Sequence, residues 1–298
     1  MTSQAAIDDS EFSFSDKDFA AIAELAKARY GLALQSSKKA LVYARLAKRL
    51  RVLHLKSFDD YCNLLKAPKG ADEQQHFLSA LTTNVTHFFR EMHHFTMLKE
   101  QIAPALLKKA KTGEAVRLWS SACSAGQEAY CMAASLLAGA PDLQKHNVKI
   151  LATDIDPQIV AVARQARYPA DQRAAIPKEW SKLIIGPTNT ADQSFEIPKT
   201  TRDLVTFAEL NLIGDWPMRK AFDVIVCRNA AIYFDKTTQA RLWQRFADQM
   251  VPGGHLMIGH SERVSGPAND SFRSVGITTY QKATVATATS PEPTKETT

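Results

Sequence analysis

Residues 116–130, VRLWSSACSAGQEAY, decide the fold of this chain. They begin with an apolar run of strand length, pass through a turn of small residues and open the helical pattern EAYCMAASLLAGA. Strand-like runs return later as KILATDID, DVIVCRN and GGHLMIG, with helix-like segments such as PQIVAVARQARY and KTTQARLWQRFADQM between them. Because buried parallel strands are apolar on both faces and need helical crossovers, this alternation predicts a doubly wound α/β sheet over residues 115–283.

Residues 16–80 are predicted to form a small all-α domain ahead of that sheet. The segment DKDFAAIAELAKARYGL has apolar residues at helical spacing and ends at Gly31, a plausible helix C-cap. The next helical segment, SKKALVYARLAKRLRVLHLKS, carries an apolar stripe of Val42, Leu46, Leu50 and Leu53. Residues 81–114 are expected to be a linker and helix, and residues 1–15 a flexible N-terminus.

The second of these helices is strongly basic. Residues 37–57 contain seven Lys or Arg and no acid, in a chain whose net charge is +6. Without acids for i,i+4 pairs, a solvated face is one reading and a docking surface for an acidic partner is the other. The second reading assigns substrate docking to Arg45, Lys48 and Arg49.

Two segments interrupt the α/β pattern. Residues 170–205 carry three prolines, with Pro169 just before them, and the short β-prone pieces KLIIG and SFEIP, which predicts a small inserted β subdomain. The composition of residues 284–298 predicts a disordered tail.

The chain has no sign of secretion or membrane insertion. It lacks a run of about 18 apolar residues, and its acidic N-terminus does not have the layout of a signal peptide. Its four cysteines form no C-x-x-C pair, so neither a disulfide framework nor a zinc knuckle is expected. These features predict a cytoplasmic protein with reduced thiols.

The turn after the first strand predicts the kind of ligand. A dinucleotide-binding turn would read G-x-G-x-x-G, whereas here only Gly126 is present, with Ala122, Ser124 and Ala125 around it. Small residues still allow close backbone approach, so a nucleoside without phosphates fits better, and S-adenosylmethionine (SAM) is the obvious one. Glu128 in the following helix either meets a cationic group of that ligand or is an ordinary first-turn acid.

Polar residues also follow two later strands. Asp154 is placed to bind ribose hydroxyls, because Asp156 precedes a proline and looks like a helix N-cap. Arg228 and Asn229 end the run DVIVC, with Tyr233 shortly after. A helix cap for Asn229 and a packed aromatic for Tyr233 are the alternatives.

Taken in order, these segments resemble the chemotaxis receptor methyltransferases, the CheR family. The resemblance spans roughly residues 16–283 and rests on LTTNVTHFFRE, SACSAGQEAY, ATDIDPQIVAVARQARY, FAELNLI, FDVIVCRNAAIYFDKTTQARLWQRFADQMVPGGHLMIGHSERV and TTYQKA. It implies a Rossmann-like SAM methyltransferase domain that forms methyl esters on receptor glutamates. The implied partners are the acidic helices of methyl-accepting receptors, and the implied product is S-adenosylhomocysteine (SAH).

The resemblance also implies site residues. Those implied to contact SAM are Asn84, Thr86, Arg90, Ala122, Glu128, Asp154, Asn211, Leu212, Arg228 and Asn229. Arg90 and Tyr233 match residues that the family places near the transferring methyl, and they are taken as the catalytic pair.

The chemistry is consistent with the residue types. A glutamate with a pKa of about 4.3 is already ionised at pH 7, so no general base is needed, and the chain shows no activated nucleophile. Arg90 offers bidentate donors to a carboxylate of either the acceptor or SAM.

His93 and His94 would point about 100° apart on a helix, so no metal site is expected. Two rivals stay open, a methyltransferase acting on nucleic acid and a non-catalytic SAM-binding sensor, although the basic helix lacks interleaved aromatics for stacking bases.

Overall fold

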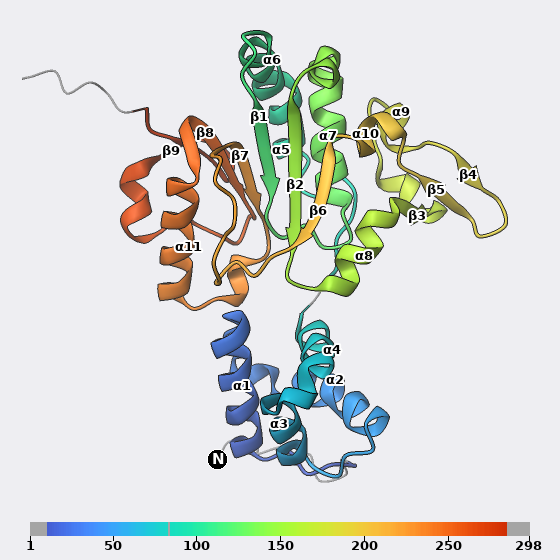
Figure 1. Ribbon diagram of the computed structural model, residues 1–298, viewed down its shortest axis with the longest axis vertical. Helices are drawn as coiled ribbons and strands as arrows, with labels where there is room; N and C mark the ends of the chain where they lie inside the picture. The colour runs from blue at the N-terminus through green and yellow to red at the C-terminus, as the bar shows by residue number, and fades with distance from the viewer. Residues whose placement is uncertain (1–10, 83, 285–298) are drawn as a thin grey trace, which may run out of the picture.

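The computed structural model describes residues 11–82 and 84–284. The predicted flexible N-terminus and disordered tail therefore fall largely outside the described residues. Within them the chain forms a helical domain followed by an α/β domain (Figure 1).

A seven-stranded sheet organises the α/β domain, in the order β6-β2-β1-β7-β8-β10-β9. The strands β6, β2, β1, β7 and β8 pair in parallel, whereas β10 is antiparallel to both β8 and β9. Their bounds are β1 Val116–Ser120, β2 Val148–Asp154, β6 Val205–Glu209, β7 Phe222–Cys227, β8 Met250–Ile258, β9 Phe272–Gly276 and β10 Thr279–Lys282. The chain leaves β1 in one direction for β2 and β6, then returns to β7 on its other side. This reversal is the topological switch point where doubly wound sheets bind ligands.

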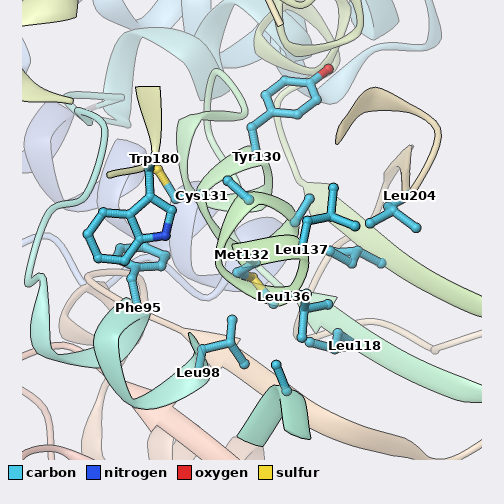
Figure 2. Close-up of a cluster of buried hydrophobic side chains, with 14 of the residues drawn as sticks. Phe95, Leu98, Leu118, Tyr130, Cys131, Met132, Leu136, Leu137, Trp180 and Leu204 are labelled. Atoms are coloured by element: carbon cyan, nitrogen blue, oxygen red, sulfur yellow. The ribbon is translucent and has the colours of Figure 1, made fainter. Parts of the chain in front are cut away.

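Alternate residues of the central strands build two separate cores. Leu118, Val224 and Val226 belong to a cluster with helices α5, α6 and α7, part of which Figure 2 shows. Trp119 and Ile225 belong to the opposite cluster, with α11. Both faces of the sheet are therefore covered, which is why the strand sequences are apolar throughout.

The helices of the α/β domain fall between or ahead of the strands. Their bounds are α5 His93–Met97, α6 Ala103–Lys111, α7 Gln127–Gly139, α8 Pro157–Gln165, α9 Ser181–Ile184, α10 Lys199–Arg202 and α11 Lys236–Asp248. A small antiparallel sheet, ordered β3-β5-β4, lies beside α7 and α8 (Figure 1). It is formed by β3 Arg167–Pro169, β4 Thr188–Asn189 and β5 Ser194–Glu196. The predicted fold class is confirmed, including this inserted β subdomain.

Four helices form the N-terminal domain, α1 Asp16–Tyr30, α2 Lys39–Val52, α3 Phe58–Lys66 and α4 Ala71–Leu81. Ser15 and Asp18 form a capping box that starts α1, and Gly31, with φ 73°, ends it as predicted. The apolar stripe of α2 is buried in a core with Tyr61 and Phe77.

The basic face of α2 is only partly free, because two of the three proposed docking residues bond within the N-terminal domain. Docking by this face stays a prediction. Arg49 forms two hydrogen bonds to Glu73 of α4, of 3.0 and 2.7 Å, and Tyr61 donates to the same carboxylate. Arg45 donates to carbonyl groups at the end of α4. The acids missing from the helix itself are thus supplied by another helix, and Arg45 and Arg49 hold the domain together, whereas Lys48 is exposed.

The N-terminal domain lies against the carboxyl ends of β1 and β2 (Figure 1). Leu32 forms a β-bridge with Phe234, and the Ala33 N–H donates to the Tyr233 carbonyl over 2.7 Å. On the other side of the interface, the Ser79 hydroxyl donates to Asp156 over 2.7 Å. The helical domain therefore closes the edge of the sheet at which a ligand would bind.

Candidate functional site

A cavity of about 310 Å³ lies at this edge, within the size range of small-molecule sites. It brings together every residue that the sequence suggested for cofactor binding or catalysis: Asn84, Thr86, Arg90, Ala122, Glu128, Asp154, Asn211, Leu212, Arg228, Asn229 and Tyr233. In particular, the guanidinium-bearing Arg90 and the carboxylate-bearing Asp154 open onto the same space, although they are 64 residues apart in the chain.

The turn after β1 holds Asp154 in place. Ser124 has a left-handed backbone, with φ 48°, which aims its N–H at Asp154 Oδ2 over 2.7 Å. The Asp156 N–H donates to the other oxygen over 3.1 Å. Burial raises the pKa of Asp154, while these two N–H groups act in the opposite direction by favouring the carboxylate.

Asp156 has the capping role predicted for it. Its Oδ1 accepts hydrogen bonds from the backbone of Gln158 and Ile159 at the start of α8. Its Oδ2 accepts from Asn84 Nδ2 over 3.2 Å, which ties the segment after α4 to the α/β domain. Asp154 is therefore the carboxylate at this strand end that lines the cavity.

Glu128 and Arg228 form a buried ion pair at the cavity wall. Arg228 Nη1 lies 3.1 Å from Glu128 Oε2, and the Ser120 hydroxyl donates to Glu128 Oε1 over 2.6 Å. Burial raises the pKa of Glu128, although the neighbouring guanidinium opposes that rise. Glu128 thus forms an ion pair with an arginine of the protein itself. The sequence did not indicate this pairing.

Arg228 also organises the segment that carries Arg90. Its Nη2 donates to the backbone carbonyl of Arg90, and its Nε lies 3.6 Å from Glu91 Oε2. Phe88 and Phe89, which precede Arg90, are buried. The backbone of this segment is therefore fixed both by these two side chains and by the Arg228 hydrogen bond.

The Arg90 side chain is held much less tightly. It is half-buried, and its Nη1 donates to the Val85 carbonyl over 3.3 Å. Among residues 11–82 and 84–284 it forms no ion pair with a carboxylate. A guanidinium on a fixed backbone with free donors, at the wall of a cavity, is suited to receive an anionic group.

The remaining predicted residues contribute in different ways. Asn211 uses its side-chain amide within the protein, donating to the Arg29 carbonyl of α1 over 2.9 Å and accepting from the Ile213 N–H. Asn229 is not a helix cap and has φ 57°. Tyr233 packs against the N-terminal core and also lines the cavity, and its role near the transferring methyl stays a prediction.

The helical domain supplies a wall that the sequence did not reveal. Tyr30, Leu32 and Leu78 line the cavity beside Ile155 and Phe234. No local signal marks these residues, because Tyr30 and Leu78 fit the apolar pattern of α1 and α4 and Leu32 lies in the turn after α1. Only docking of the two domains turns them toward the ligand space.

The two adjacent histidines do not diverge as predicted. Their ring centroids lie 4.1 Å apart, and both rings have a nitrogen near Thr278 Oγ1, at 3.4 Å for His93 and 3.0 Å for His94. Burial lowers the pKa of His94 to about 3, so this ring is neutral. Possible ligand atoms of Glu91, His93 and His94 lie within 4.8 Å of one another, but Glu91 already has the Arg228 cation beside it. The absence of a metal stays a prediction.

Comparison with known proteins now decides the family. The model described as "CheR methyltransferase, SAM binding domain" matches residues 84–281, and "CheR methyltransferase, all-alpha domain" matches residues 17–82. The chain belongs to the CheR methyltransferase family. The two matches meet at the junction between the helical and α/β domains, and the cofactor of this CheR-family protein is SAM.

Curated relatives agree with this assignment over most of the chain. A "Probable chemotaxis protein methyltransferase" of Rhizobium etli is 46% identical over 260 residues, covering 85% of this chain and 95% of its own. "Chemotaxis protein methyltransferase 2" of Pseudomonas aeruginosa is 38% identical over 275 residues, covering 92% and 95%. The "Chemotaxis protein methyltransferase" of Escherichia coli is 36% identical over 256 residues, covering 84% and 86%. This CheR-family chain is thus a SAM-dependent methyltransferase, and none of its described helices is long and apolar enough to cross a membrane.

Proposed function

We propose that this protein transfers the methyl group of SAM to glutamate side chains of chemotaxis receptors, forming methyl esters and SAH. The observation that carries the proposal is Arg90, an arginine without a carboxylate partner among the described residues, on the wall of the same cavity as Asp154. The names of the relatives support a role in chemotaxis.

The cavity residues suit the cofactor. Asp154 offers a carboxylate to ribose hydroxyls, and the small Ala122 permits close approach to the turn after β1. Leu212, three residues after the end of β6, offers an apolar surface to the adenine base of SAM. Asn84, Thr86, Asn211 and Asn229 add neutral polar groups, and Glu128 adds a carboxylate that already forms an ion pair with Arg228.

The protein's own part in the reaction is positioning. SAM supplies an activated methyl group, and a glutamate acceptor is already an anion at neutral pH, so no proton has to be removed. Arg90 would orient a carboxylate, and the buried Phe88 and Phe89 keep the backbone of Arg90 fixed. Arg228, tied to Glu128 and to the Arg90 carbonyl, sets the position of that segment.

Transfer of radiolabelled methyl from SAM to receptor-rich membranes tests the proposal. We expect label on the receptors that base hydrolysis releases as volatile methanol, which is diagnostic of a carboxyl ester. Base-stable label would instead indicate another acceptor, such as nucleic acid. Binding of SAM without any transfer would indicate a sensor.

Tyr233 is expected to orient the reacting groups through its hydroxyl. The ring packs against the N-terminal core, so Tyr233→Phe keeps that packing and removes only the oxygen. We expect kcat to fall about fivefold with unchanged affinity for SAH, because one hydrogen bond contributes about 1 kcal/mol. Steady-state kinetics and calorimetry make the measurement, and an unchanged kcat would remove Tyr233 from the catalytic residues.

We now assign docking of an acidic receptor helix to two exposed lysines of the N-terminal domain, Lys48 and Lys56, rather than to Arg45 and Arg49. The double change Lys48→Glu with Lys56→Glu is expected to raise KM for receptor about tenfold at low salt and to leave SAH affinity alone, because exposed charges act mainly on association.

The matched control for docking is Lys108→Glu with Lys111→Glu in α6. Both lysines are exposed, and Figure 1 shows α6 at the end of the sheet far from the helical domain. This variant has the same net charge as the docking variant and is expected to keep the wild-type KM. Equal effects of the two variants would argue against a localised docking surface.

A further inference from the structure

The turn that follows β7 carries several of the cavity residues, and a carboxylate from another loop holds it. Glu262 lies just after β8 and is 4% exposed. Its Oε2 accepts from the Asn229 N–H over 3.1 Å and from the Gly259 N–H over 2.6 Å, and its Oε1 accepts from the Ala230 N–H over 3.1 Å. One side chain thus links the carboxyl ends of two neighbouring strands.

The held turn has a left-handed residue at its first position. Asn229 has φ 57°, a region that most residues avoid and that asparagine tolerates better than most. The three N–H groups bonded by Glu262 include two from this turn, and buried N–H groups without an acceptor are unfavourable. Since an ionised carboxylate is a strong acceptor for several N–H groups at once, Glu262 stabilises this conformation over its alternatives.

The groups around Gly259 are closely packed. A Cβ on Gly259 would lie 2.8 Å from Glu262 Oε2 and 3.0 Å from the Asn229 backbone nitrogen. The position therefore requires glycine for space, and the carboxylate fits directly between the two strand ends.

We propose that Glu262 is a positioning residue for cofactor binding. It does not line the cavity itself, whereas Arg228, Asn229 and Ala230 do. By fixing the turn, it sets where these three residues meet SAM, and through Arg228 it also sets the Glu128 ion pair. The inference rests on SAM binding alone and does not depend on which acceptor is methylated.

The test is SAH binding by calorimetry to full-length Glu262→Gln. Glutamine has the same shape but replaces one acceptor oxygen by an NH₂ group that faces N–H donors. We expect the Kd for SAH to rise at least tenfold. Asp270→Asn is the matched control, since it removes an exposed acid from the following loop, and its Kd is expected to equal that of wild type.

A double-mutant cycle separates positioning from general loss of stability. Asn229→Gly removes the side chain and adopts φ 57° without strain. If Glu262 acts through this turn, the factor by which Glu262→Gln raises the Kd for SAH should be at least three times smaller in the Asn229→Gly background than in wild type. An equal factor in both backgrounds, or a Kd within twofold of wild type for Glu262→Gln, would overturn the proposal.

Gly259→Ala gives an independent measurement if Glu262→Gln does not fold. Its Cβ pushes on both the carboxylate and the Asn229 backbone, so a tenfold rise in the Kd for SAH is expected here too. A folded Gly259→Ala protein with wild-type SAH affinity would reject the inference. Failure of methyl transfer to receptors by the wild-type protein would leave these binding results intact and would count only against the proposed acceptor.

Discussion

Replacement of Arg90 by alanine is expected to lower kcat for methyl transfer by about 10²–10³-fold, the usual cost of losing a charged group that positions or stabilises the reacting atoms. The fold should survive, because the side chain is half-buried and donates to the Val85 carbonyl, five residues away in the same segment. Single-turnover transfer of labelled methyl measures the rate, and thermal unfolding checks the fold.

The affinity for SAH shows which carboxylate Arg90 binds. If the guanidinium holds the carboxylate of the acceptor, Arg90→Ala keeps the wild-type Kd for SAH. If it holds the cofactor's own carboxylate, the Kd rises together with the loss of rate. Arg90→Lys is the matched control, since it keeps the charge but loses the planar pair of donors and should recover only part of the rate. A wild-type rate for Arg90→Ala would reject both roles.

Replacement of Glu128 by alanine is expected to reduce the free energy of unfolding by about 3–5 kcal/mol, the typical effect of removing one partner of a buried ion pair. Of its carboxylate partners among the described residues, Arg228 would keep only the more distant Glu91, whose Oε2 lies 3.6 Å from Nε. The Ser120 hydroxyl would also lose the oxygen to which it donates over 2.6 Å. Urea unfolding measures the change.

The control for this prediction is an ion pair at the surface. Asp203→Ala breaks the exposed pair with Lys199, and such pairs contribute little because both charges stay hydrated. We therefore expect its unfolding midpoint to stay close to that of wild type. Comparable losses in Glu128→Ala and Asp203→Ala would show that the buried pair is not a structural anchor of the cavity.

The two predictions concern one cavity wall. Arg90 lines the cavity with free donors, and the Glu128–Arg228 pair lines the same cavity, with Arg228 donating to the Arg90 backbone carbonyl. Glu262 fixes the same region from the side of β8. The contact residues are thus held by buried carboxylates, as is usual where a site must be rigid before its ligand arrives.

The helical domain has more than one task in this arrangement. Its residues Tyr30, Leu32 and Leu78 close the cavity, and its backbone at Ala33 bonds to that of Tyr233. An acidic partner that docks on the exposed lysines would therefore lie on the same domain that forms one wall of the cofactor space. The domain that carries the proposed docking lysines thus also lines the cavity that contains Arg90 and Tyr233, the proposed catalytic residues.

The sequence by itself determined the features that depend on neighbouring residues. Apolar periodicity predicted the doubly wound sheet and the helical domain, Asp156 before a proline predicted the cap of α8, and Gly31 predicted the end of α1. Asp154 and Arg228 stand at the carboxyl ends of two apolar runs. Because parallel strands bring their carboxyl ends to one edge of the sheet, these residues predicted that polar side chains would gather there, around one cavity.

Only the tertiary structure decided which charges pair. Arg49 meets Glu73 across two helices, and Glu128 meets Arg228 from residues 100 positions apart, so neither pair has a local sequence signal. The same holds for Glu262, whose role depends on two strand ends being adjacent. Periodicity and capping are set within a few residues of chain, whereas the energy of a buried charge depends on the groups that packing places around it.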